Sequence, residues 1–250
     1  MPAYNSTFAI GGVSPSADSF VVKVEYIIMF CNFNQRQIAM GGGRSFPNRF
    51  NAWTLVASIT DNLRIDNLTM AEKKNIFVII GSASQNSANQ KLVDNFANLI
   101  KFDFNLTIFS DLKKLPHFDP ELSSDNPPKL IVEFRELISK ADGILISTPE
   151  YVFSIPSGLK NAIEWCVSTT VFSDKPIGLL TASAHGQKGH EELQLIMKTV
   201  MTKFTDETTL LIQGIKGKIN EQGEITDTKT TDDLTKFINA FKTLIKNASH

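Results

Sequence analysis

The sequence predicts an α/β fold in which a five-stranded parallel sheet is covered by helices on both faces. From residue 75 onward, short apolar segments alternate with longer segments whose apolar residues recur at helical spacing. The short segments are almost continuously apolar, which is typical of strands that are buried on both sides. This alternation, repeated along the chain, favours one layered domain with a parallel sheet.

Strands and helices are expected to alternate strictly. The predicted strands cover residues 75–80, 104–110, 142–148, 175–184 and 207–214, and the predicted helices cover 87–102, 127–141, 156–169, 189–204 and 230–245. Thr230 or Thr231 is expected to cap the last helix. A layered domain of roughly 180 residues buries enough surface to be stable alone.

Residues 1–69 differ from the rest of the chain. They contain nine of its 51 charged residues, which are 25 Lys and Arg plus 26 Asp and Glu. Met70 begins the sequence Met-Ala-Glu-Lys-Lys, which is typical of the start of a cytoplasmic protein. We therefore expect residues 1–69 to be an N-terminal extension that is disordered or absent from the native protein, and residues 70–250 to be the folded domain. A targeting segment is a third interpretation.

Composition gives no support for several classes of function. The net charge of −1 provides no basic surface for nucleic acid or for an anionic membrane. Cys31 and Cys166 form no metal-ligand pattern or disulfide framework, so we expect no metal site and a reducing, cytoplasmic location. The most apolar early segment, residues 20–33, is short for a membrane span and contains two charged residues.

Three loops are expected to form the binding site, because ligands of such sheets bind beyond the carboxyl ends of the strands. These loops cover residues 81–89, 148–156 and 181–189. The first, GSASQNSAN, joins a strand to a helix N-terminus, where free N–H groups and the helix dipole favour an anion such as phosphate. It lacks the Walker A and GxGxxG patterns, and a well-capped helix without a ligand is the alternative interpretation.

The second loop places aromatic residues at the expected site. Its sequence Thr-Pro-Glu-Tyr-Val-Phe offers Tyr151 and Phe153 as surfaces on which a flat ligand could stack. Pro149 and Pro156 restrict the backbone at both ends of the loop. Packing of the two aromatic rings against neighbouring helices or another subunit is an equally good explanation of the composition.

Four segments together resemble the NADPH-dependent FMN reductase family. They are GSASQNSANQKL, LPHFDPEL, ADGILISTPEYVFSIPSGLKNAIEW and KPIGLLTASAHGQKG. The resemblance runs from about residue 75 to the C-terminus and leaves residues 1–69 uncovered. It implies a flavodoxin-like doubly wound sheet with strand order 2-1-3-4-5, and makes residues 70–250 an FMN-binding reductase domain.

The resemblance also implies the cofactor-binding residues. They are Ser82, Ser84, Ser87, Ala88 and Asn89 around the phosphate; Pro149, Glu150, Tyr151, Val152 and Ser154 along the flavin ring; and Ser183, His185 and Gly186 in the third loop. Glu150 is expected to fix its loop by hydrogen bonding rather than to act as an acid. No catalytic residue and no metal ligand is predicted.

Two positions depart from the family pattern. The family usually has arginine where this chain has Ser84, so backbone amides and hydroxyls must bind the phosphate, unless Lys91 or another subunit compensates. The family also prefers Asn-Gly where this chain has Val152 and Phe153, which makes the second loop more apolar.

The function implied by the resemblance is NAD(P)H-dependent reduction of FMN, followed by reduction of a quinone, azo compound or free flavin. The expected cofactors are FMN and NADPH or NADH, and the expected assembly is a homodimer or homotetramer. The alternative is a flavodoxin-like electron carrier or redox sensor that NAD(P)H does not reduce. The sequence lacks the T-G-x-T loop and acidic composition that are typical of flavodoxins.

Overall fold

The computed structural model describes residues 73–84 and 86–248. These residues form a sheet of five parallel strands in the order β2-β1-β3-β4-β5. The predicted fold class and strand order are therefore confirmed. The predicted extension, residues 1–69, and its boundary at Met70 lie outside the described residues.

The three central strands are almost wholly buried. The strands are β1 (Lys74–Ile80), β2 (Phe104–Phe109), β3 (Gly143–Thr148), β4 (Ile177–Ser183) and β5 (Thr209–Gln213). Every residue of β3 is buried, whereas the edge strands β2 and β5 have one buried residue each and are otherwise half-buried or exposed. This difference explains why the sequence of the central strands is continuously apolar.

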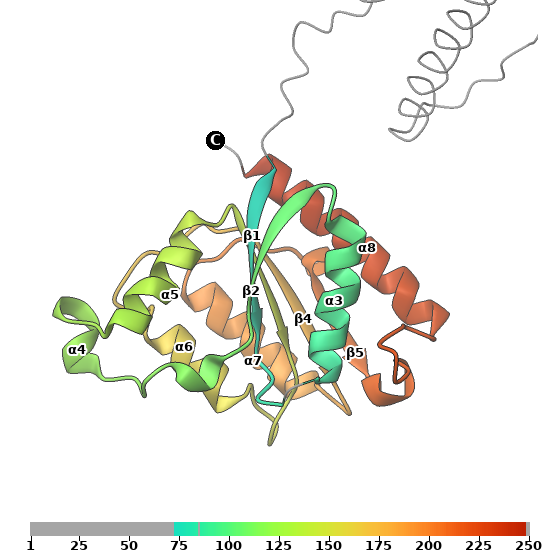
Figure 1. Cartoon of the computed structure of the whole chain (residues 1–250), viewed down its shortest axis with the longest axis horizontal. Coiled ribbons are helices and arrows are strands. Elements are labelled where there is room, and N and C mark those ends of the chain that lie inside the picture. Colours follow the sequence, from blue (N-terminus) through green and yellow to red (C-terminus); the bar gives the residue numbers. More distant parts are fainter. Residues whose placement is uncertain (1–72, 85, 249–250) are drawn as a thin grey trace, which may run out of the picture. The chain divides into compact units, whose positions relative to one another are not determined.

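Helices cover both faces of the sheet (Figure 1). They are α3 (Ala88–Ile100), α4 (Pro120–Asp125), α5 (Lys129–Lys140), α6 (Ser157–Glu164), α7 (Gln187–Thr199) and α8 (Thr228–Asn247), with short 3₁₀ turns η2 (Leu112–Lys114), η3 (Asp206–Thr208) and η4 (Ile215–Gly217). Figure 1 shows α3 and α8 on one side of the sheet and α5 and α6 on the other.

Strand β1 contributes to both layers of the core. Ile76 and Val78 pack with α3 and α8, in a cluster that includes Phe96 and Phe241. The intervening Phe77 packs in the cluster of the opposite face, together with residues of α5, α6 and α7. Successive side chains of a strand point to opposite faces, so an unbroken apolar strand supplies both layers.

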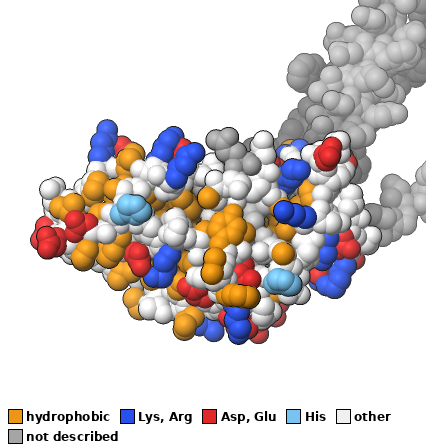
Figure 2. Space-filling model, turned by 90° about the horizontal axis from the view of Figure 1, so that it is seen from below, with side chains coloured by type: hydrophobic (Ala, Val, Ile, Leu, Met, Phe, Trp, Pro, Cys, Tyr) orange, Lys and Arg blue, Asp and Glu red, His pale blue; other side chains and the backbone are white. Residues whose placement is uncertain are grey.

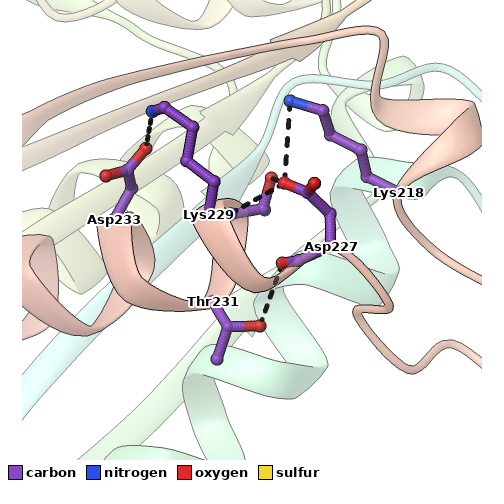
Figure 3. Close-up of polar contacts among 6 residues, drawn as sticks. Lys218, Asp227, Lys229, Thr231 and Asp233 are labelled. Carbon is purple, nitrogen blue, oxygen red and sulfur yellow. Dashed lines mark hydrogen bonds and ion pairs between the residues drawn. The ribbon is translucent and has the colours of Figure 1, made fainter.

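The start of α8 differs from the sequence prediction. The helix begins at Thr228, and its N-cap is Asp227, whose side chain accepts a hydrogen bond from the Thr230 backbone N–H at 2.8 Å. The Asp227 carboxylate also lies 3.9 Å from Lys218 Nζ, and Figure 3 shows these contacts. The predicted cap at Thr230 or Thr231 is therefore wrong, because an aspartate just before them satisfies the free N–H groups instead.

Other helices also differ from the prediction, and α6 and α4 show the largest differences in this part of the chain. Helix α6 ends at Glu164 rather than at residue 169. Arg135 Nε donates a hydrogen bond of 2.9 Å to the backbone carbonyl of the next residue, Trp165. A side chain that satisfies a terminal carbonyl allows a helix to end there. The short helix α4 falls in a segment for which no helix is predicted, and Asp119 caps it.

In the part of the chain that the structure describes, no helix combines the length and the apolar content required to cross a membrane.

Candidate functional site

Two adjoining cavities lie at the carboxyl ends of the strands. The β5-side cavity, of about 820 Å³, is lined by Ser82, Ser84, Asn86, Ser87, Ala88, Asn89, Lys91, Pro149, Tyr151, Ala182, Ser183, Ala184, Gly214, Ile215, Lys216 and Ile219. The β2-side cavity, of about 770 Å³, lies between the first loop, the segment after β2 and the start of α6. Tyr151 and three residues of the first loop line both cavities. Figure 2 views this edge and shows hydrophobic side chains gathered near its centre.

The first loop presents backbone N–H groups to the β5-side cavity. Gly81 begins the loop where a Cβ atom would lie 2.4 Å from Thr148 Oγ1, so only glycine allows this approach. Asn86 has a positive φ of 54°, and Ser87 caps α3. The N–H groups of Asn86, Ser87 and Ala88 make no hydrogen bond to any other described residue. Successive free amides at a helix N-terminus form a site for an anion.

The Asn89 side chain forms hydrogen bonds within the protein interior. Its side chain is 2% exposed, donates to the Ala182 carbonyl at 3.0 Å, and accepts from Ser147 Oγ at 3.0 Å. These bonds tie the first turn of α3 to the ends of β3 and β4. The side chain therefore positions the first loop relative to the sheet.

Glu150 joins the second loop to the third. Its carboxylate accepts from the backbone N–H groups of Gly186 at 3.2 Å and Gly189 at 2.8 Å. Gly186 is the N-cap of α7 and offers no side chain, so Glu150 satisfies the helix terminus from another loop. The expectation that Glu150 fixes its loop is confirmed.

The second loop ends in a tight hairpin whose tip is strained. Tyr151 and Ser154 exchange backbone hydrogen bonds of 2.9 and 3.0 Å. Between them, Val152 and Phe153 have φ angles of 52° and 59°, which a type I′ turn requires and which Asn-Gly adopts best. The left-handed conformation costs roughly 1–2 kcal/mol for each residue with a Cβ atom. Val152 is nevertheless 95% exposed and Phe153 73% exposed.

Two lysines line the β5-side cavity. Lys91 Nζ donates to the carbonyls of Asn220 and Glu221, both at 3.1 Å, so its charge is already engaged in fixing the segment before α8. Lys216, on η4, makes no hydrogen bond or ion pair with any described residue. It is the free cation of this cavity among the residues that the structure describes.

Comparison with known proteins agrees with this geometry. A sequence model of the NADPH-dependent FMN reductase family matches residues 74–214, which is more than half of the chain. The chain belongs to this family. The predicted recognition is thus confirmed, and with it an NAD(P)H-dependent oxidoreductase function with FMN and a nicotinamide as cofactors.

Individual relatives each match about 70% of this reductase. The quinone reductase of Escherichia coli (strain K12) is 28% identical over 186 residues, which are 71% of this chain and 98% of that protein. The 2-hydroxy-1,4-benzoquinone reductase of Burkholderia sp is 28% identical over 179 residues, covering 69% and 96%. The structure of FerB, a flavoenzyme NAD(P)H:(acceptor) oxidoreductase from Paracoccus denitrificans, superposes with a TM-score of 0.60 and 25% identity, covering 70% and 98%.

Most of the predicted cofactor-binding residues of the reductase line the β5-side cavity. Those lining it are Ser82, Ser84, Ser87, Ala88, Asn89, Pro149, Tyr151 and Ser183; those that do not are Glu150, Val152, Ser154, His185 and Gly186. Glu150 and Gly186 bond to each other beside the cavity, and His185 is exposed. The predicted residues therefore divide into some that face the cavity and others that support or surround it.

Sequence reasoning missed the contribution of the fifth strand. Gly214, Ile215 and Lys216 follow β5 and line the β5-side cavity, so the three-loop prediction is incomplete. The rule that parallel sheets bind ligands at their carboxyl ends applies equally to β5 and could have identified this segment.

A buried histidine was also missed. His190 Nδ1 lies 2.8 Å from Thr181 Oγ1, and burial lowers the pKa of His190. Cys166 is buried as well, and burial raises the pKa of its thiol to about 12, which makes it an unreactive core residue.

Proposed function

We propose that the chain is a quinone reductase that binds FMN in the β5-side cavity and reduces small two-electron acceptors with NAD(P)H. The observation that carries the proposal is the pairing, in one cavity, of free backbone amides at the α3 N-terminus with an apolar wall. FMN has a dianionic phosphate at one end and a flat ring at the other. When bound, FMN supplies the two-electron redox chemistry between the nicotinamide and the acceptor.

The phosphate end fits the first loop. The N–H groups of Asn86, Ser87 and Ala88 would donate to the phosphate, with the dipole of α3 favouring its charge. Ser82 and Ser84 line the same cavity with hydroxyl groups. Lys216 supplies the positive charge that Ser84 lacks, since Lys91 is bonded elsewhere.

The ring end fits the apolar side of the cavity. Pro149 and Tyr151 would lie along one edge of the ring, while Ile215 and Ile219 provide apolar surface from the segment after β5. The N–H groups of Ala184 and His185 make no hydrogen bond with any other described residue. They would stabilise negative charge on the reduced ring, and Glu150 holds this loop in place.

Assembly and location belong to the proposal as well. Resemblance to the family supports a homodimer or homotetramer, and the cysteine content supports the cytoplasm. A small molecule is the proposed electron acceptor, because the relatives at 28% identity are quinone reductases.

The test is a visible absorption spectrum of the full chain. The protein is mixed with FMN, freed of unbound flavin by gel filtration, and measured before and after anaerobic addition of NADPH. We expect a protein-bound flavin spectrum that NADPH bleaches within seconds, followed by recovery when a quinone is added.

Two results would contradict the proposal. Bound flavin that NADPH leaves oxidised would favour the alternative of an electron carrier or sensor. Absence of bound flavin at micromolar concentrations would contradict the assignment of the β5-side cavity.

A further inference from the structure

The hairpin tip has properties that the binding of FMN does not explain. Val152 and Phe153 are exposed to 95% and 73%, and neither lines the β5-side or the β2-side cavity. Both have the positive φ angles that disfavour a residue with a Cβ atom, most of all a β-branched one. These exposed fractions show that packing within the described molecule compensates little for placing two apolar side chains in this strained turn. Strain without internal compensation indicates a role outside the fold.

The tip is held rigidly in place. Tyr151 and Ser154 close the hairpin with two backbone hydrogen bonds. On one side of the tip, Glu150 is bonded to the N-terminus of α7, and on the other the Ile155 N–H donates to Glu192 at 3.1 Å. A fixed apolar projection is suited to recognition, because little freedom is lost when a ligand contacts it.

The tip is also continuous with the site. Tyr151, the residue before it, is 42% exposed and lines both cavities. Residues 151–159 include no charged residue, so the chain that joins the tip to the cavities adds no charge beside the rim where they meet. Val152 and Phe153 thus follow directly after a residue that lines both cavities.

We propose that Val152 and Phe153 form an apolar lip that selects the electron acceptor, favouring uncharged aromatic acceptors with apolar substituents over small charged ones. This inference rests on the proposed function and specifies its acceptor class. The lip contacts the part of the acceptor that stays outside the cavity, so it changes the preference among acceptors and leaves FMN binding and NADPH oxidation unchanged.

The test uses the double variant Val152→Asn, Phe153→Gly in the full chain. Asn-Gly is the preferred sequence of a type I′ turn, so the variant loses the apolar lip while its fold is stabilised, with the melting temperature raised by roughly 2–6 °C. Steady-state rates are measured with 2-methyl-1,4-naphthoquinone and with ferricyanide. We expect kcat/KM for the naphthoquinone to fall roughly tenfold, and kcat/KM for ferricyanide to change less than about twofold.

Two further variants make the result specific. Phe153→Leu keeps an apolar side chain at the tip and should keep most of the preference for the naphthoquinone. Phe102→Gly removes a phenyl group that is 79% exposed just before β2, away from the site, and should leave the ratio of the two kcat/KM values unchanged.

The inference fails separately from the proposed function. If NADPH does not bleach flavin bound to the unaltered chain, the proposed function is wrong, because no reduced flavin is formed to pass electrons to an acceptor. If bleaching is normal but the double variant keeps the same ratio of kcat/KM values, the lip has no role in selection. A change in molar mass by light scattering, with an unchanged ratio, would assign the tip to contact between copies and also overturn the inference.

Discussion

The first loop and the second loop border the same site, but the first offers polar backbone groups and the second exposes apolar side chains. The first loop is small and polar, and its N–H groups at Asn86, Ser87 and Ala88 are left free. The second loop is fixed through Glu150 and ends in the exposed, strained pair Val152 and Phe153. In each loop one buried or bonded side chain fixes the backbone, which leaves neighbouring groups available for ligands.

This comparison separates two roles within one motif. Asn89 and Glu150 fix the loops relative to the sheet and to α7, whereas Ser84 and Lys216 have side chains that line the cavity. Substitution of a fixing residue should therefore affect both stability and binding. Substitution of a cavity-lining residue should affect binding alone.

The largest effect is expected for Asn89→Ala. The variant removes the amide partner of the Ala182 carbonyl and leaves Ser147 Oγ only its longer bond, of 3.4 Å, to the backbone carbonyl of residue 89, both in a buried position. We expect the free energy of unfolding to fall by about 2–3 kcal/mol, and FMN affinity to fall more than roughly tenfold because the first loop is displaced. Urea unfolding and fluorescence titration with FMN measure the two effects. Asn98→Ala, on the exposed face of α3, is the matched control and should change neither.

A smaller effect is expected for Glu150→Gln. The amide retains the size of the side chain but loses the negative charge that faces the N-terminus of α7. We expect a loss of about 1 kcal/mol in stability and a several-fold increase in the dissociation constant of FMN as the third loop loosens. Glu164→Gln breaks only a partly exposed pair with Lys160, and an equal loss there would contradict the special role of Glu150.

Lys216→Gln should affect binding without affecting stability. Its charge is free in the described part of the molecule, so its removal breaks no internal contact. We expect FMN affinity to fall about three- to tenfold at low salt and less at high salt, because an exposed charge is screened. Lys113→Gln alters the β2-side cavity and serves as the control. A larger loss of FMN affinity with Lys113→Gln than with Lys216→Gln would place the phosphate in the β2-side cavity and contradict the assignment.

The smallest effect concerns pH and His190. Burial lowers the pKa of His190 in the folded protein. Below about pH 6.5, therefore, His190 is protonated in the unfolded chain while it is still neutral in the folded chain. Stability is full above that pH and declines as the pH falls toward the lowered pKa. We expect a melting temperature a few degrees lower at pH 5.5 than at pH 7.5, and a smaller difference in His190→Gln. An unchanged difference in that variant would exclude His190 as the cause.

The central sheet was predictable from the sequence because burial on both faces leaves an unmistakable apolar pattern in β1, β3 and β4. Helix ends were less predictable, since Asp227 and Arg135 satisfy terminal groups through contacts that the local pattern does not specify. The role of Asn89 could not be predicted, because its partners lie 58 and 93 residues further along the chain. Lys216 could have been identified, because the expected strand order already places the carboxyl end of β5 at the same edge of the sheet as the other loops.

A crystal structure of the full chain with FMN would show directly which cavity holds the cofactor. We expect the phosphate within hydrogen-bonding distance of the Ser87 and Ala88 N–H groups, and the ring in the β5-side cavity beside Tyr151. Density for the phosphate among Asp111, Lys113 and His117 in the β2-side cavity would contradict it.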